Sequence, residues 1–78
     1  MAQAPTFSEL KDRLHEKYEC DLRTFANGTN YFERQIDGQV LTYPVDNYQD
    51  NDRVALWVVK SICRRLKVDL SEFHLKMD

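Results

Sequence analysis

The dipeptide Asp37-Gly38 is the feature of this sequence that most restricts its fold. It separates residues 30–36 from residues 39–43, two segments with the composition and patterning of β-strands. Asp-Gly in this setting predicts a two-residue turn of type I′, because both positions of that turn need positive φ. The turn also predicts the register of the hairpin, which pairs Ile36 with Gln39, Arg34 with Leu41 and Phe32 with Tyr43. Most of the large apolar side chains then share one face.

A further strand is expected over residues 18–25, where side chains alternate as in a strand that is covered on one face. Asn27 and Gly28 follow it, and both residues accept positive φ at low cost, so the chain can turn back into the second strand. Pro44 is expected to end the third strand. The sequence therefore predicts a sheet of three antiparallel strands with one apolar side.

A helix is expected before this sheet. Thr6 and Glu9 have the spacing of a capping box, so the helix should begin there and run to about Lys17. Its apolar residues recur at spacings of three and four and share one face; they are Phe7, Leu10, Leu14 and Tyr18. A single apolar stripe predicts a single packing surface.

A second helix is expected over residues 54–66, although its first six residues are apolar and rich in β-branched side chains. The apolar positions continue through Ile62 and Leu66 at helical spacing, which favours a helix over a strand. One residue of the acidic loop before it should cap this helix. The three candidates are Asp50, Asn51 and Asp52.

The end of the chain repeats the pattern of its beginning, because residues 69–72 have capping-box form and predict a short last helix that brings Phe73 onto the fold. The expected fold class is α+β, with the order α-β-β-β-α and both helices packed on the one apolar face of the sheet. A single domain is expected over residues 1–78, with a disordered tail at residues 1–5 and the folded part at residues 6–75.

Length and charge exclude several function classes. A chain of 78 residues buries only about 60 to 65% of its unfolded surface, which leaves no room for a deep small-molecule site. No apolar segment approaches the roughly 18 residues of a membrane span, and the N-terminus lacks the features of a signal peptide, so a cytoplasmic protein without membrane contact is expected. The net charge of −2, from 13 acidic and 11 basic residues, disfavours binding of nucleic acid through bulk charge but allows a local basic patch.

Cys20 and Cys63 are too few and too isolated for a zinc site, which needs paired ligands at short spacing. Buried, reduced thiols are expected in a chain without a secretion signal. Neither thiol has an evident histidine and carboxylate beside it, so a thiol nucleophile is not expected. The sequence predicts no metal site and no cofactor.

Four segments in this order resemble the HicA family of small toxin ribonucleases. They are Gly-Thr-Asn-Tyr at residues 28–31, the Asp-Gly hairpin, the strand ending at residues 41–44 and the helical segment at residues 59–64. The resemblance extends over roughly residues 7–75. It implies the α-β-β-β-α fold of that family, which is related to the double-stranded RNA-binding domain.

The sequence departs from the family at the position that matters most for catalysis. The family's ribonuclease activity is attributed to the first His of a Gly-Ser-His-His segment, and Asn30 occupies the aligned position here. An amide neither takes nor gives a proton near neutral pH, whereas an imidazole does. His15 and His74 are distant from the Gly turn in sequence and are expected to be solvated. No catalytic residue is therefore assigned.

The second helix offers binding chemistry. Lys60, Arg64 and Lys67 are spaced four and three residues apart, which predicts one exposed basic face, with Arg65 beside it. Such a face can contact phosphates, although a solvated helix surface explains the same residues. With the Gly turn included, the candidate binding residues are Gly28, Thr29, Asn30, Tyr31, Lys60, Arg64, Arg65 and Lys67.

Three functions are compatible with these patterns. The first is a non-catalytic, HicA-like binding module whose partner is RNA or an antitoxin-like protein. The second is an active ribonuclease, the toxin of a toxin-antitoxin pair, with a substituted catalytic group. The third is a homodimeric interaction domain, because residues 54–59, which include Trp57, carry more apolar surface than one thin sheet can cover.

Overall fold

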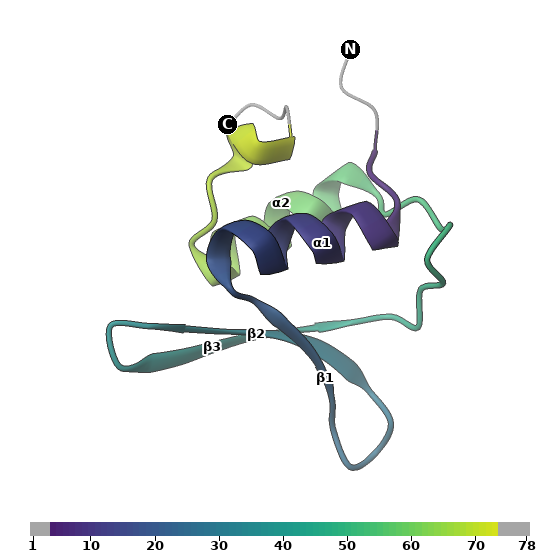
Figure 1. Cartoon of the computed structure of the whole chain (residues 1–78). Coiled ribbons are helices and arrows are strands. Elements are labelled where there is room, and N and C mark those ends of the chain that lie inside the picture. Colours follow the sequence, from purple (N-terminus) through teal and green to yellow (C-terminus); the bar gives the residue numbers. More distant parts are fainter. Residues whose placement is uncertain (1–3, 74–78) are drawn as a thin grey trace.

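The computed structural model describes residues 4–73, apart from the side chain of Glu72, and confirms the predicted fold class (Figure 1). The elements are α1 (Phe7–Tyr18), β1 (Asp21–Thr24), β2 (Asn30–Ile36), β3 (Gln39–Val45), α2 (Leu56–Leu66) and a short 3-10 helix, η1 (Leu70–Phe73). The strands form one antiparallel sheet in the order β1-β2-β3. Both helices lie on the same side of this sheet, as expected (Figure 1). His74 and the ends of the predicted domain lie outside the described residues.

The β2–β3 hairpin has the predicted register. Ile36 pairs with Gln39, Arg34 with Leu41 and Phe32 with Tyr43. Asp37 and Gly38 have φ values of 50° and 77°, both positive as a type I′ turn requires. The local turn chemistry therefore determines which side chains face the helices.

Pro44 does not end β3, because the strand continues to Val45. Outward from a two-residue turn, hydrogen-bonded pairs alternate with non-hydrogen-bonded pairs, and the pair of Pro44 with Tyr31 belongs to the second kind. The nitrogen of Pro44 therefore points away from β2, toward the open edge of the sheet. No ladder hydrogen bond is lost there, so the expectation of a strand end was wrong.

Strand β1 is shorter than predicted at both ends. Tyr18 belongs to α1, which ends at Glu19 in the left-handed conformation with φ of 56°. At the other end, the N–H of Phe25 donates to the carbonyl of Thr29 (2.8 Å), and the N–H of Gly28 donates to the carbonyl of Phe25 (2.9 Å). Only Gly28 takes positive φ in this turn (90°), while Asn27 Oδ1 accepts from the N–H of Thr29 (3.0 Å).

The acidic loop caps α1 and not α2, contrary to the prediction. The N–H groups of Phe7 and Ser8 in the first turn of α1 donate to the carbonyls of Asp52 (2.8 Å) and Asp50 (3.1 Å). Helix α2 begins two residues later than expected, and its N-cap residue, Ala55, makes no side-chain cap. The loop carbonyls thereby satisfy N–H donors of the first turn that have no partner within α1.

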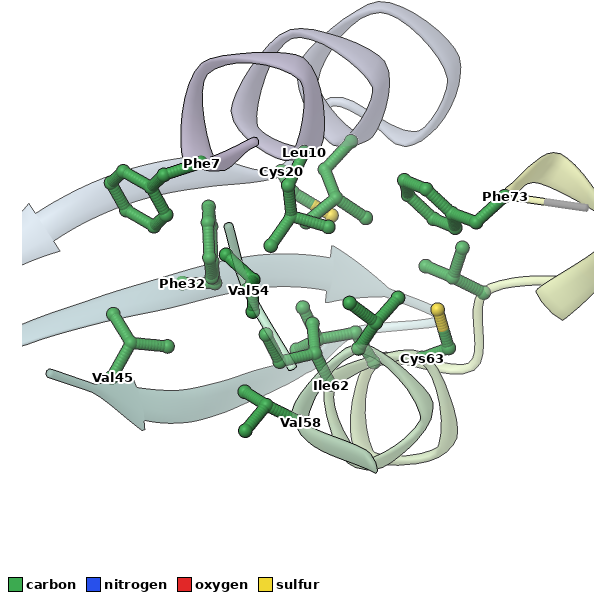
Figure 2. Packing of buried hydrophobic residues seen from close by; sticks show 14 of the residues in the cluster. Phe7, Leu10, Cys20, Phe32, Val45, Val54, Val58, Ile62, Cys63 and Phe73 are labelled. Carbon is green, nitrogen blue, oxygen red and sulfur yellow. The ribbon is translucent and has the colours of Figure 1, made fainter. Parts of the chain in front are cut away.

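The core lies between the two helices and the sheet (Figure 2). Helix α1 begins with the predicted capping box of Thr6 and Glu9. The buried apolar residues are Phe7, Leu10, Leu14, Cys20, Phe32, Val45, Val54, Val58, Val59, Ile62, Cys63, Leu66, Val68, Leu70 and Phe73. The terminal element contributes as expected, since η1 brings Leu70 and Phe73 into this cluster.

Both cysteines are free and buried, as predicted. No helix within residues 4–73 is both long enough and apolar enough to cross a membrane.

Candidate functional site

Helix α2 carries charge of one sign on an otherwise acidic chain. Its charged residues are Lys60, Arg64 and Arg65, and it contains no acidic residue. Its inner side is fully buried, and Val59, Ile62 and Leu66 point to the core as predicted. The outer face of α2 lies opposite the core. Its residues recur at helical spacing and are Trp57, Lys60, Ser61 and Arg64.

Trp57 is the most exposed large apolar side chain of this face, with 70% of its surface accessible. It lies in the first turn of α2, where the Ser61 hydroxyl donates to its carbonyl oxygen (2.9 Å). Indole rings are usually at least partly buried, and tryptophan is enriched at protein interfaces. Trp57 is also the single tryptophan of the chain.

The four basic residues predicted for this region differ in their exposure and in whether their side chains already make contacts within the fold. Arg65 Nε donates to the carbonyl of Thr42 (3.2 Å) and so covers the open edge of β3. Lys67 is exposed but lies beyond the last turn of α2, as its C-cap with φ of 58°. The Arg64 side chain makes no hydrogen bond or ion pair with any described residue, and Lys60 is half-buried beside it. Arg64 is therefore the most available cation of α2.

Asn30 links three segments. Its Oδ1 accepts a hydrogen bond from the Thr24 hydroxyl on β1 (2.9 Å), and its Nδ2 donates to Asn47 Oδ1 in the loop after β3 (3.1 Å). An amide can make both bonds at once because it carries a donor and an acceptor. The polar atoms of this side chain are thus already engaged in holding the sheet to the loop.

Tyr31 lies on the opposite face of the sheet from Asn30, because successive strand residues alternate. Its ring stacks on Phe25, with centroids 3.9 Å apart and planes 18° apart. Phe25, which is 43% exposed, was not among the candidate residues. In the sequence, Phe25 alternates with Arg23 on the side of the predicted strand that faces away from the core. This alternation is the signal that predicts the exposure of Phe25.

The Gly28 turn and the basic end of α2 do not form one site. Arg34 on β2 donates from Nη1 to the carbonyls of Leu66 (2.7 Å) and Lys67 (2.8 Å), so it marks where α2 ends over the sheet. Asn30 is four residues away along the same strand, a distance of about 13 Å at 3.3 Å per residue. The turn lies farther still and points away from the helices (Figure 1).

The remaining titratable candidates do not form a catalytic set. His15 and Asp21 are both exposed, with Nδ1 of the histidine 3.6 Å from Oδ1 of the aspartate. Burial raises the pKa of Cys20 to about 11 and that of Cys63 to about 12, so both are neutral thiols at physiological pH. Among residues 4–73, no three side chains of the metal-binding types form a cluster that could hold an ion.

Comparison of the chain with models of protein families, with curated proteins and with solved structures gave no significant match. A functional proposal therefore depends on the geometry of the residues themselves. That geometry distinguishes two regions. On the aromatic and cationic face of α2, the Arg64 guanidinium makes no hydrogen bond or ion pair with a described residue, whereas at the sheet end the Asn30 amide is hydrogen-bonded within the fold.

Proposed function

We propose that this chain is a small, non-catalytic binding module that holds RNA on the outer face of α2. The observation that carries the proposal is the exposed ring of Trp57 in line with Lys60 and Arg64. A base can stack on an exposed indole ring, and cations hold the phosphates next to it. Residues three and four apart on a helix lie about 5 to 6 Å from each other, so a base and its phosphates are within reach of the same face.

The charge pattern of α2 favours an anionic partner. All three of its charged residues are basic, and RNA offers anions beside planar bases. An acidic protein surface, such as that of an antitoxin-like partner, is the second candidate. The same cations that would hold phosphates can pair with the carboxylates of such a surface.

A relationship to the HicA family and a cytoplasmic location are parts of this proposal. The α-β-β-β-α order of elements supports the relationship. The hydrogen bonds of Asn30 to Thr24 and Asn47 support binding without catalysis, because they use this amide to hold the structure. A homodimer through residues 54–59 is less well supported, since Val54, Val58 and Val59 are buried in the chain's own core.

The fluorescence of Trp57 reports on the outer face of α2, because Trp57 is the single tryptophan of the chain. Titration with single-stranded and with hairpin RNA should quench its fluorescence. For two phosphate contacts on a single strand, affinity should fall about sevenfold between about 50 mM and about 200 mM salt. A free tryptophan amide at the same absorbance is the control for collisional quenching.

Two results would contradict the proposal. Quenching no greater than that of the control, together with no salt-sensitive binding, would reject RNA as the ligand and favour the acidic protein. If the wild-type protein cleaves the RNA and the Asn30→Ala variant does not, the hypothesis of a non-catalytic module is rejected in favour of a ribonuclease.

A further inference from the structure

A hollow of about 600 Å³ opens where α2 ends and the chain turns toward η1. Buried Cys63, Val68 and Leu70 contribute its apolar lining. Its charged lining residues are Arg64, Lys67 and Asp69. Because Arg64 also belongs to the outer face of α2, the hollow continues that face at its C-terminal end.

The two cations of the hollow are available to a ligand. Neither the Arg64 nor the Lys67 side chain makes a hydrogen bond or ion pair within the described part of the chain. The carbonyls at a helix C-terminus carry partial negative charge, which repels anions. Here the carbonyls of Leu66 and Lys67 already accept hydrogen bonds from Arg34 (2.7 and 2.8 Å), so a third cation offsets that repulsion.

Asp69 is the one carboxylate in the lining, and it has a structural role. Its Oδ1 accepts from the N–H of Ser71 (2.9 Å) at the start of η1. This hydrogen bond lowers the pKa of Asp69, so the group stays ionised and opposes an anionic ligand. The attraction of the ligand to the two cations must therefore exceed its repulsion by the one carboxylate. A terminal phosphate carries about −1.5 to −2 charge at pH 7, whereas an internal phosphate carries only one negative charge.

We infer that this hollow binds the terminal phosphate of an RNA strand that lies along the outer face of α2. The inference rests on the proposed function and extends it. Arg64 is seven residues from Trp57, about 10 Å at 1.5 Å per residue, so one strand can contact both. Residues 68–70 line the hollow where the chain leaves the C-terminal end of α2. The strand therefore ends there, with its terminal sugar against the apolar lining.

The test compares RNA oligonucleotides of one sequence that carry a phosphate at the 5′ end, at the 3′ end or at neither end. One phosphorylated form should bind about tenfold more tightly than the hydroxyl-ended form, which corresponds to 1.4 kcal/mol. The end that gains affinity gives the direction of the strand. Equal binding of all three forms would overturn the inference and leave the proposed function standing. Absence of binding by any form would overturn both.

Substitutions locate the effect. In Lys67→Gln the ratio of affinities for phosphorylated and hydroxyl-ended RNA should fall toward one. In Asp69→Asn the ratio should rise about threefold, because a repulsive charge is removed while the amide oxygen can still accept from Ser71. Lys17→Gln, which removes an exposed lysine from the last turn of α1, is the matched control and should keep the wild-type ratio. A wild-type ratio in Lys67→Gln would reject the hollow as the phosphate site.

Discussion

Helices α1 and α2 cover the same side of one sheet, yet their solvent-facing sides differ. On α1, acidic and basic residues balance; they are Glu9, Asp12 and Glu16 against Lys11, Arg13 and Lys17. Several are engaged within the fold, as in the ion pair of Lys11 with Asp50 (2.8 Å). On α2 the charges are all positive, and Trp57 is 70% exposed beside them.

The difference indicates where function should be sought. Folding and solubility alone explain a helix surface of mixed, paired charges, as on α1. They do not explain an exposed indole in line with cations of one sign.

The C-terminal end of α2 should depend strongly on Arg34. Arg34 donates to two carbonyls at that end, and its guanidinium lies 4.9 Å from the ring centroid of Tyr18, the last residue of α1. Arg34→Ala should lower the free energy of unfolding by about 2 to 3 kcal/mol, because charged hydrogen bonds and a ring contact are lost. Urea unfolding measures this loss. Arg34→Lys should recover part of it, whereas a loss below about 0.5 kcal/mol in Arg34→Ala would show that the end of α2 is held by other contacts.

The thiol in α2 should make the fold sensitive to alkali. Burial raises the pKa of Cys63 from 9.0 to about 12 and that of Cys20, which follows α1, to about 11. Above about pH 9 the unfolded chain loses these protons first, so stability is complete below that pH and falls as pH rises. The thermal midpoint should therefore decrease from about pH 9 upward, and less steeply in Cys63→Ala and in Cys20→Ala than in wild type, because each variant retains only one of the two buried thiols. Equal slopes in wild type and both variants would contradict this assignment.

The sequence predicts those features of the fold that depend on residues close together in the chain. The Asp37-Gly38 turn determines the hairpin register, and Thr6 with Glu9 determines the start of α1. The sequence does not predict the start of α2, because the loop carbonyls of Asp50 and Asp52 bind the distant N–H groups of α1. Such long-range competition leaves no local pattern.

The candidate site divides in the same way. Helical spacing predicts that Arg64 is exposed and Leu66 buried. Spacing does not reveal that Arg65 is used at the edge of β3 or that the Asn30 amide is used between β1 and a loop. Those contacts arise only when segments far apart in sequence pack together.

The cap of α1 contributes to stability and not to binding. Thr6→Ala removes the capping box and should cost about 1 kcal/mol in unfolding free energy. RNA affinity should stay within about twofold of wild type, because the Thr6 side chain hydrogen-bonds to Glu9 and not to a residue of the outer face of α2. Thr6→Ser keeps the cap and serves as the control. A change in affinity with Thr6→Ala alone would couple α1 to the binding face.

The start of α2 has room for a cap that it lacks. Ala55 has extended φ and ψ of −55° and 142°, a geometry in which a serine side chain can accept from the first N–H groups of the helix. Ala55→Ser should raise the unfolding free energy by about 0.5 to 1 kcal/mol. A stability equal to that of wild type would show that those N–H groups are already satisfied, for example by water.

The contrast between the helices is tested most directly by charge reversal at matched positions. Lys60→Glu with Arg64→Glu changes α2, and Arg13→Glu with Lys17→Glu changes α1, at the same spacing of four residues and with the same change in net charge. Anisotropy of a labelled RNA measures affinity, and circular dichroism checks that both variants fold. The α2 pair should lose more than about tenfold in affinity, while the α1 pair stays within about threefold. Equal losses in the two variants would contradict a binding face on α2.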